Sequence, residues 1–267
     1  MNREMLSAYL AKIGFKGNTS PDLTTLFALH QHQHSSIPFE NLDIVNGRTV
    51  ELDEDKIFNK LVYSNRGGYC FELNSLINRV LKTLQFNVEK KLGRVHLTEN
   101  PSGRGHLVNI VTFNGQQWLI DTGFGSNTPR APLPIKFNQT LKVEKQTFRF
   151  IEDAFFGVML QCKVQDQWIN QYSLDMSYVC DGDIEYANHY ASTHSNSRFT
   201  TQLVVVARTN YGNNILLNNR LKLAHADTVT ETFINDVSSF HQILKQHFGI
   251  DNPVQLEKFE RYLINEE

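Results

Sequence analysis

Apolar residues in the first third of the chain recur with the spacing of amphipathic helices. We interpret Ser20 and Pro21 as an N-cap and a first-turn proline. The helix predicted after them carries four apolar residues with helical spacing: Leu23, Leu26, Phe27 and Leu29. A second helical stretch is predicted over residues 53–63, and a third begins within "RGGYCFELNS" (66–75). One apolar face of this third helix, in phase with Cys70, consists of Leu73, Leu76, Ile77, Val80, Leu81 and Leu84.

After about residue 86 the pattern changes to short β-prone runs separated by Gly, Asn and Pro. These runs include "HLVNIVTF", "QQWLID", "FGVMLQCKV" and "TQLVVVA". Helical spacing returns from about Thr230 and ends at Gly249, which we interpret as a C′ glycine. The apolar positions of this last helix are Phe233, Val237, Phe240, Ile243, Leu244 and Phe248. Because helices precede strands, without repeats or low-complexity linkers, the sequence predicts an α+β fold.

Composition narrows the class of protein further. A chain of 267 residues with 40% hydrophobic content can bury a sizeable core, as one unit or as two to three closely packed domains. The formal net charge of −2 gives no general electrostatic reason to bind nucleic acid or an anionic membrane. The first residues carry scattered charges without an apolar h-region, and no later stretch is long enough to span a bilayer. We therefore expect a cytoplasmic protein.

The cysteines and a histidine-rich stretch raise the question of metal binding. Cys70, Cys162 and Cys180 are odd in number, far apart and free of CxxC spacing, so we expect reduced thiols rather than disulfides or a zinc site. The stretch "HQHQH" places His30 and His34 at i, i+4 on one helix face. A glutamine stands where the HExxH motif has its glutamate, and no third ligand is obvious. We expect a solvated helix face and no metal.

Cys70 lies at the start of the third predicted helix. Gly67 and Gly68 allow close backbone approaches and a sharp turn into that helix. The free N–H groups and the positive end of the helix dipole favour a thiolate there. Free cysteines are also among the most buried residue types, so an inert core thiol is the alternative. Position alone leaves both interpretations open.

A hairpin supplies a base and a group that orients it. Asn114-Gly115 is a strong signal for a two-residue turn, and the resulting register makes His106 and Asp121 diagonal neighbours on one face of the sheet. A three-residue loop would send the two side chains to opposite faces. His106 could instead be a hydrogen-bonded strand histidine and Asp121 a turn carboxylate. His96 is a weaker candidate base because no carboxylate is placed beside it. With Cys70, the pair forms a set of nucleophile, base and orienting group.

Four segments together resemble the arylamine N-acetyltransferase family over most of the chain. They are "IPFENLDI" (37–44), "RGGYCFELN" (66–74), the histidine of "SGRGHLVNIV" and "IDTGFG" (120–125). The resemblance implies a helical bundle over 1–86 carrying the catalytic cysteine. It also implies an antiparallel β-barrel over 87–197 carrying the histidine and aspartate, and an α/β lid over 198–267. The site would be a Cys-His-Asp arrangement like that of cysteine proteases.

The activity implied by the resemblance is acetyl transfer from acetyl-coenzyme A to the nitrogen, or oxygen, of arylamines, arylhydrazines and arylhydroxylamines. Transfer would be ping-pong through an acetylated Cys70, with acetyl-coenzyme A as co-substrate, no permanently bound cofactor, and no nucleic acid or membrane partner. The oligomeric state stays open. The implied catalytic residues are Cys70, His106 and Asp121; the aromatic pocket residues are Phe39, Phe124 and Phe199; the coenzyme contacts are Ser102, Gly103, Gly125 and Ser126.

Two positions depart from the family pattern. Thr122 stands before Gly123 where an apolar residue is expected, and Asn109 lies within a usually apolar strand. Asn109 is expected on the face opposite His106, so neither departure affects the predicted triad. A thiol hydrolase or a transglutaminase-like acyl transferase could use the same three residues, and a binding module could hold them as a buried polar network. Consumption of acetyl-coenzyme A with and without an arylamine separates these alternatives.

Overall fold

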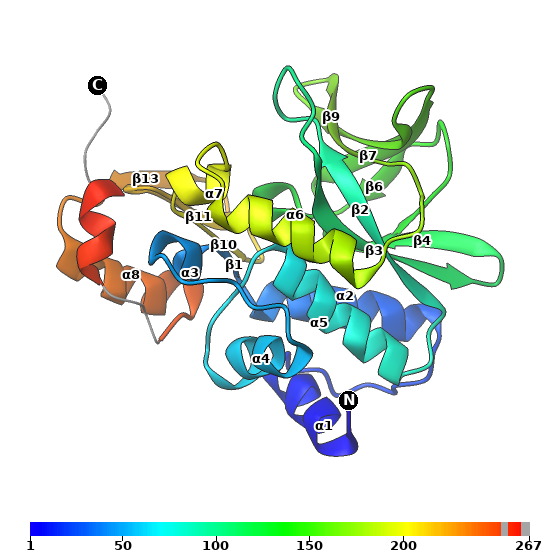
Figure 1. The fold of residues 1–267 in the computed structure, drawn as a ribbon, viewed down its shortest axis with the longest axis horizontal. Helices are drawn as coiled ribbons and strands as arrows, with labels where there is room; N and C mark the ends of the chain where they lie inside the picture. The colour runs from blue at the N-terminus through cyan, green and yellow to red at the C-terminus, as the bar shows by residue number, and fades with distance from the viewer. Residues whose placement is uncertain (252–255, 263–267) are drawn as a thin grey trace.

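The helices of the first third form where the apolar spacing predicts them (Figure 1). The computed structural model describes residues 1–251 and 256–262. The helical elements of this part are α1 (Arg3–Lys12), α2 (Leu23–Ser36), α3 (Leu42–Val45), α4 (Glu54–Phe58), a π-helical turn (Asn59–Tyr63) and α5 (Cys70–Thr83), and the short strand β1 (Phe39–Glu40) lies between α2 and α3. Among the residues described, no helix combines the length and apolar content that crossing a membrane requires.

The start of α2 differs from the prediction by two residues. Asp22, rather than Ser20, is the N-cap, because its carboxylate accepts a hydrogen bond from the backbone N–H of Thr25 at 2.8 Å. The predicted helix over 53–63 is confirmed as α4 followed by the π-helical turn, with Asp53 as its N-cap. The predicted apolar face of α5 is also confirmed, since all of its members are buried.

A large antiparallel sheet follows the helices. Its strand order is β5-β4-β3-β2-β9-β8-β7-β6. The strands are β2 (Val88–Val95), β3 (Arg104–Phe113), β4 (Gln116–Ile120), β5 (Leu133–Pro134), β6 (Leu141–Val143), β7 (Gln146–Asp153), β8 (Gly157–Val164) and β9 (Gln167–Leu174). A bridge between Phe137, just after the edge strand β5, and Phe150 on β7, next to the other edge strand β6, brings the two ends of the sheet close together, so the sheet nearly closes into a barrel.

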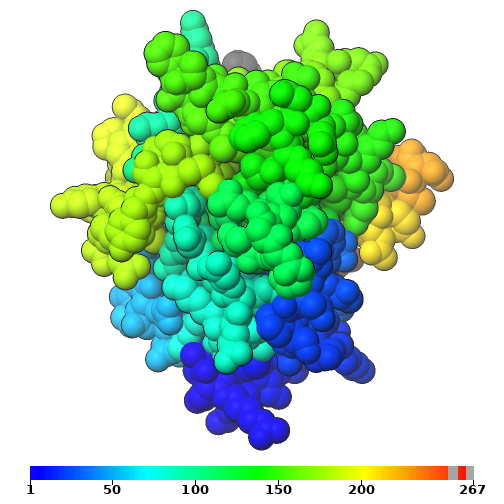
Figure 2. All heavy atoms as spheres, turned by 90° about the vertical axis from the view of Figure 1, so that its right-hand side faces the viewer, coloured from blue at the N-terminus to red at the C-terminus, as the bar shows by residue number. Residues whose placement is uncertain are grey.

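The two faces of β3 pack against different cores. Val108 and Ile110 point into the barrel interior with Phe148, Phe150 and other buried residues. Leu107 belongs to the cluster that includes the apolar face of α5. This alternation follows from the two-residue period of a strand. Figure 2 shows the arrangement from one side, with the N-terminal helices (blue to cyan) below the strands of the large sheet (green). Helix α5 therefore lies on the outer face of the barrel.

The last part of the chain adds helices and a second antiparallel sheet. The strand order of this sheet is β1-β10-β11-β12-β13. Its elements are α6 (Asp181–Thr193), α7 (Arg198–Thr201), β10 (Val204–Arg208), β11 (Asn213–Leu217), β12 (Arg220–Ala224), β13 (Val229–Phe233), α8 (Val237–Phe248) and a 3-10 helix (Leu256–Tyr262), with a short 3-10 turn at Gly125–Asn127 in the barrel part. The predicted α+β class with helical, barrel and α/β parts is confirmed.

The helical, barrel and α/β regions exchange secondary-structure elements, so they are not separated cleanly along the chain. Phe39 on β1 pairs with Val206 on β10, so the N-terminal part contributes the edge strand of the second sheet. Helix α6 extends from the second sheet toward β3 (Figure 1). The division at 86/87 and 197/198 stays a prediction.

The predicted start of the last helix is wrong. Residues 229–233 form β13 and pair with β12 from Arg220↔Phe233 to Ala224↔Val229. Helix α8 begins only at Val237, where the Asp236 carboxylate accepts the backbone N–H of Ser239 at 2.9 Å. The predicted end is confirmed, since Gly249 is left-handed with φ of 68°. Phe233 is in phase with the helix in sequence, but it is 51% exposed on this edge strand, so its spacing does not reflect a buried helix face.

The glycine pair before Cys70 is required by a close approach. A β-carbon on Gly67 would lie 2.2 Å from the carbonyl oxygen of Pro38. This approach belongs to a bridge in which Gly68 N–H donates to Pro38 at 3.2 Å and Glu40 N–H donates to Gly68 at 2.9 Å. The bridge aligns the segment before α5 with β1. Phe39 and Cys70 are thereby brought to the same region.

We predict that Gly67→Ala destabilises the protein by roughly 1–3 kcal/mol, because the bridge to β1 must open to admit a methyl group. The matched control is Gly182→Ala in α6, where the added β-carbon would meet its nearest neighbour, Cys180 Sγ, at an ordinary 3.7 Å. Urea unfolding of both variants measures the difference. Equal midpoints for the two variants would contradict the steric explanation.

Candidate active site

The hairpin that places the predicted base and its partner forms as expected. Asn114 and Gly115 have φ of 48° and 76°, which are the angles of a two-residue type I′ turn. The register runs from Phe113↔Gln116 to Asn109↔Ile120. Continued by one pair, it sets Val108 opposite Asp121, so His106 and Asp121 are diagonal neighbours.

His106 and Asp121 form a buried ion pair. His106 Nε2 lies 2.8 Å from Asp121 Oδ2, and both side chains are almost fully buried. Burial by itself would lower the pKa of His106, but the charge of Asp121 and hydrogen bonds with Asp121 and Cys70 raise it to about 10. Burial would raise the pKa of Asp121, whereas the charge of His106 and hydrogen bonds from three neighbours hold it below its ordinary value. The pair is therefore an imidazolium and a carboxylate at neutral pH.

Cys70 is the first residue of α5 and lies beside this pair. Its thiol is buried, and its Sγ is 3.9 Å from the carbonyl oxygen of Gly105, which directly precedes His106. The Cys70 side chain is among the groups that raise the pKa of His106. The competing candidate His96 instead bonds to Ser173 Oγ at 2.8 Å and makes no hydrogen bond to Asp121. The structure thus brings the three predicted residues together.

Two further residues hold Asp121, and sequence reasoning missed both. The Tyr172 hydroxyl donates to Oδ2 at 2.9 Å, and Asn74 Nδ2 donates to Oδ1 at 2.9 Å. The backbone N–H of Gly123 also donates to Oδ1 at 2.9 Å. Asn74 lies one helical turn after Cys70, so its position on the same helix face could have indicated its role. Nothing in the sequence pointed to Tyr172, because β9 is far from β2 in the chain and the two strands become neighbours only in the folded sheet.

The departures from the family pattern lie inside the same polar network. Thr122 donates its backbone N–H to Asn74 Oδ1 at 2.9 Å, and its hydroxyl accepts from Gln33 Nε2 at 2.9 Å. Asn109 lies on the face opposite His106, as predicted, and accepts from Asn78 Nδ2 at 2.7 Å. Both departures are therefore satisfied polar groups behind the site.

The prediction that "HQHQH" forms a solvated helix face is wrong. His30 is fully buried and His34 is 8% exposed, because α2 packs against α5 and the segment after β4. Burial lowers the pKa of His30 to about 4 and, together with the His30 ring, lowers that of His34 well below its ordinary value. In the described part of the chain, no third Cys, Asp, Glu or His completes a metal-binding set with them.

A cavity of about 650 Å³ opens onto Cys70 and His106. This volume lies within the range of small-molecule sites. The ring centroids of Phe39 and Phe199 are 6.1 Å apart, and Phe124 packs against His106 at 4.7 Å. All predicted aromatic and coenzyme residues line the cavity: Phe39, Phe124, Phe199, Ser102, Gly103, Gly125 and Ser126. Sequence reasoning missed three cationic lining residues, which come from α7 and β12: Arg198, Arg220 and Lys222.

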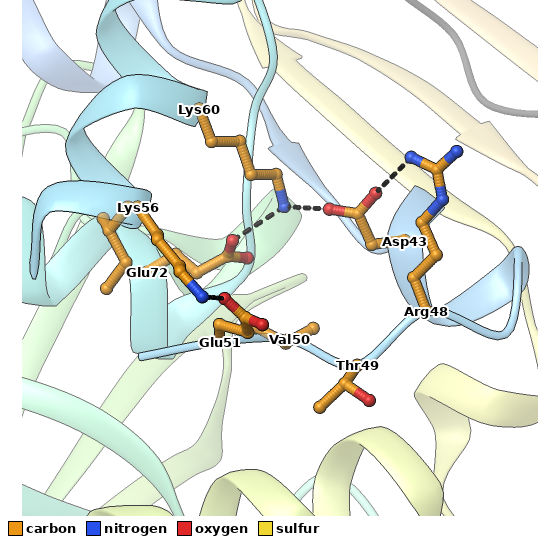
Figure 3. Close-up of a pocket in the computed structure, with 9 residues that line it drawn as sticks. Asp43, Arg48, Thr49, Val50, Glu51, Lys56, Lys60 and Glu72 are labelled. Carbon is orange, nitrogen blue, oxygen red and sulfur yellow. Dashed lines mark hydrogen bonds and ion pairs between the residues drawn. The ribbon is translucent and has the colours of Figure 1, made fainter. Parts of the chain in front are cut away.

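Charged residues fix the start of α5 from the side away from the cavity. Glu72 Oε2 accepts the backbone N–H of Tyr69 at 3.1 Å, and Glu72 Oε1 pairs with Lys60 at 2.7 Å. Lys60 also pairs with Asp43 at 2.6 Å, across a smaller hollow of about 200 Å³ (Figure 3). Because these charged side chains pair with one another, we assign them a structural role rather than a role in ligand binding. Their effect is to anchor the first turn of the helix that begins with Cys70.

Comparisons with known proteins agree with this geometry. A family model described as N-acetyltransferase matches residues 22–256. The chain is 32% identical to the arylamine N-acetyltransferase / N-hydroxyarylamine O-acetyltransferase of Salmonella typhimurium, over 92% of this chain and 88% of that protein.

Solved structures agree as well. The arylamine N-acetyltransferase structure from Salmonella typhimurium has a TM-score of 0.92 at 29% identity, covering 98% of both chains. The Mycobacterium marinum arylamine N-acetyltransferase in complex with CoA has a TM-score of 0.88 at 30% identity, covering 97% of this chain and 98% of that one. With a family model spanning most of its length and relatives matched almost end to end, the chain belongs to the arylamine N-acetyltransferase family.

Proposed function

We propose that this protein transfers an acetyl group from acetyl-coenzyme A to the nitrogen, or oxygen, of arylamines, arylhydrazines and arylhydroxylamines. The observation that carries the proposal is a buried Cys70, His106 and Asp121 set opening onto a cavity lined by aromatic side chains. The names of the relatives support it, as does a structural neighbour solved with CoA. We also propose a cytoplasmic location, because the three cysteines are odd in number, far apart in the chain and free of CxxC spacing.

In the first step the Cys70 thiolate attacks the acetyl carbonyl carbon of the thioester. A bond forms between that carbon and Sγ, the bond from the carbon to the coenzyme sulfur breaks, and the His106 imidazolium gives its proton to the leaving thiolate. We assign the developing oxyanion to the backbone N–H groups at the start of α5 that have no partner within the helix. The products are free coenzyme A and acetylated Cys70.

In the second step the amine attacks the acetyl-Cys70 thioester. Neutral His106 accepts a proton from the nitrogen as the new amide bond forms, and the Cys70 thiolate leaves and is restored beside the imidazolium. Asp121 keeps the same ring nitrogen of His106 protonated in both steps. The cycle therefore begins and ends with the His106 imidazolium paired with Asp121.

We assign residues of the cavity wall to each of the two substrates. Phe39, Phe124 and Phe199 would hold the aromatic ring of the acceptor near Cys70, since ring faces and edges pack favourably at these separations. The proposed coenzyme contacts are Ser102, Gly103, Gly125 and Ser126, which line the same cavity. The Ser102 hydroxyl donates to the Gly103 carbonyl at 2.7 Å and so stiffens its part of the wall.

Acetyl-coenzyme A without an amine should leave one acetyl group on Cys70, because coenzyme A departs before the acceptor reacts. Cys162 and Cys180 lie outside the cavity and should stay unmodified, which gives an internal control within one experiment. Intact-mass and peptide analysis measure the label, and added arylamine should remove it. Equal release of coenzyme A with and without amine would identify a hydrolase instead. An unlabelled Cys70 with intersecting double-reciprocal lines would indicate direct transfer.

Asp121→Asn should abolish most transfer. The amide cannot stabilise the His106 imidazolium, and its NH₂ group would face donors that now point at Asp121. The equivalent Asp-to-Asn change in the catalytic triad of a serine protease costs about 10⁴ in kcat, which serves as a guide to magnitude. Alkylation of Cys70 at neutral pH should slow in parallel.

The matched control is Asp153→Asn. Asp153 caps an exposed hairpin by accepting backbone N–H groups at 2.9 and 3.0 Å, and it is not part of the cavity lining. This variant should retain near wild-type transfer. Near wild-type transfer and alkylation by Asp121→Asn would assign Asp121 a purely structural role.

The stability contributed by the ion pair should depend on pH in a defined direction. The raised pKa of His106, about 10 against an ordinary 6.5, gives stability that is complete below pH 6.5 and lost as the pH rises toward 10. The lowered pKa of Asp121 gives stability that is present above pH 3.8 and lost as the pH falls below it. Urea unfolding should show the largest gap between wild type and His106→Gln from pH 3.8 to 6.5. A gap independent of pH would contradict the ion pair.

A further inference from the structure

Two buried histidines on α2 have no part in the proposed chemistry. His30 and His34 lie one helical turn apart, with ring centroids 6.2 Å apart in an edge-on arrangement. The Nδ1 atom of each ring is buried without a hydrogen-bond partner among the described residues. Burying two imidazoles costs free energy unless their polar atoms are used. The hydrogen bond made by the other ring nitrogen of His30, Nε2, explains why this histidine is buried here.

His30 reaches the backbone of Asp121. Its Nε2 lies 2.9 Å from the Asp121 carbonyl oxygen. A carbonyl can only accept a hydrogen bond, so Nε2 carries the proton and His30 is a neutral donor. The last pair of the β3–β4 ladder is Asn109↔Ile120, so the Asp121 carbonyl lies beyond the strand pairing. His30 therefore satisfies a buried acceptor that the sheet does not reach.

The peptide group that follows Asp121 is held from both sides. His30 on α2 binds its carbonyl, and Asn74 Oδ1 on α5 accepts its N–H, that of Thr122, at 2.9 Å. The tilt of this peptide sets the direction of the Cα–Cβ bond of Asp121, and hence where Oδ2 meets His106. A displacement of the carboxylate of even a fraction of an ångström lengthens that 2.8 Å contact. The carboxylate direction thus depends on a residue outside the triad.

We propose that His30 is a positioning residue for Asp121, acting through the backbone carbonyl of that aspartate. The proposal rests on the function proposed above, in which Asp121 orients His106. His34 lies on the same face of α2 and is also buried, yet it makes no hydrogen bond to Asp121 or to the peptide that follows it. The two histidines therefore form a natural pair of test and control.

Other hydrogen bonds from α2 should keep the protein folded when residue 30 is substituted. Gln33, also on α2, donates through Nε2 to the Leu73 carbonyl at 2.9 Å and to Thr122 Oγ1 at 2.9 Å. Its own Oε1 accepts from the Tyr9 hydroxyl at 2.8 Å. Loss of the His30 bond leaves these contacts intact. Helix α2 should then stay docked while the Asp121 peptide gains freedom.

The experiment compares His30→Met, His30→Gln and His34→Met. Glutamine places its amide nitrogen near the position of Nε2 and can donate to the carbonyl, whereas methionine has the same length without a donor. We expect His30→Met to lose about tenfold in kcat and in the rate of Cys70 alkylation by iodoacetamide, with KM for the amine unchanged. His30→Gln and His34→Met should each stay within about twofold of wild type. The pH profile of alkylation should shift only in His30→Met.

Three results would overturn the proposal: equal losses in His30→Met and His34→Met, a loss in His30→Gln as large as in His30→Met, or a raised KM with unchanged kcat. Urea unfolding checks that the variants are folded. If His30→Met does not fold, His30→Asn replaces it, because the shorter amide falls short of the carbonyl, and the same outcomes decide. Alkylation needs neither acetyl-coenzyme A nor an amine, so a failure of the proposed function would leave this readout of His30 standing.

Discussion

The burial of one negative charge governs the arrangement of the elements around it. A carboxylate removed from water is strongly destabilising unless hydrogen-bond donors surround it, and Asp121 is 1% exposed. Its oxygens are met by donors from β3, β9, α5 and its own loop: His106, Tyr172, Asn74 and Gly123. Removing one such donor costs about 1–3 kcal/mol, so the charge requires these elements to meet at one point. The packing of α5 against the barrel is a consequence.

Helix α5 links the buried Asp121 to the nucleophile Cys70. Its apolar face packs on the outer side of the large sheet, and its polar positions, Asn74 and Asn78, face β3 and Asp121. Its N-terminus carries Cys70 and is fixed by Glu72 and Lys60 on one side and by the glycine bridge to β1 on the other. The thiol is thus delivered to the imidazolium by contacts that lie outside the cavity. Preorganisation of this kind is what acyl transfer through a cysteine requires.

The cavity exists only because the three parts of the chain meet. Phe39 comes from the strand that joins the N-terminal part to the second sheet, Phe124 follows the barrel hairpin, and Phe199 lies in α7. Polar residues at unusual positions, Asn109 and Thr122, are satisfied within the network behind the triad rather than exposed to the cavity. The wall toward substrate is consequently apolar and aromatic near Cys70, and the buried polar groups serve to hold it in place.

Local patterns in the sequence determined the pieces that carry the site. The 3.6-residue period predicted the face of α5, the Asn-Gly turn set the register that joins His106 to Asp121, and the glycines before Cys70 indicated a close approach. Those features depend on residues near one another in the chain. Tertiary structure alone decided the burial of His30, the contact of Tyr172 with Asp121, and the pairing that made residues 229–233 a strand rather than the start of α8. Each of these depends on which distant segment lies alongside, and a polar helix face or a short apolar run is compatible with either environment until that neighbour is in place.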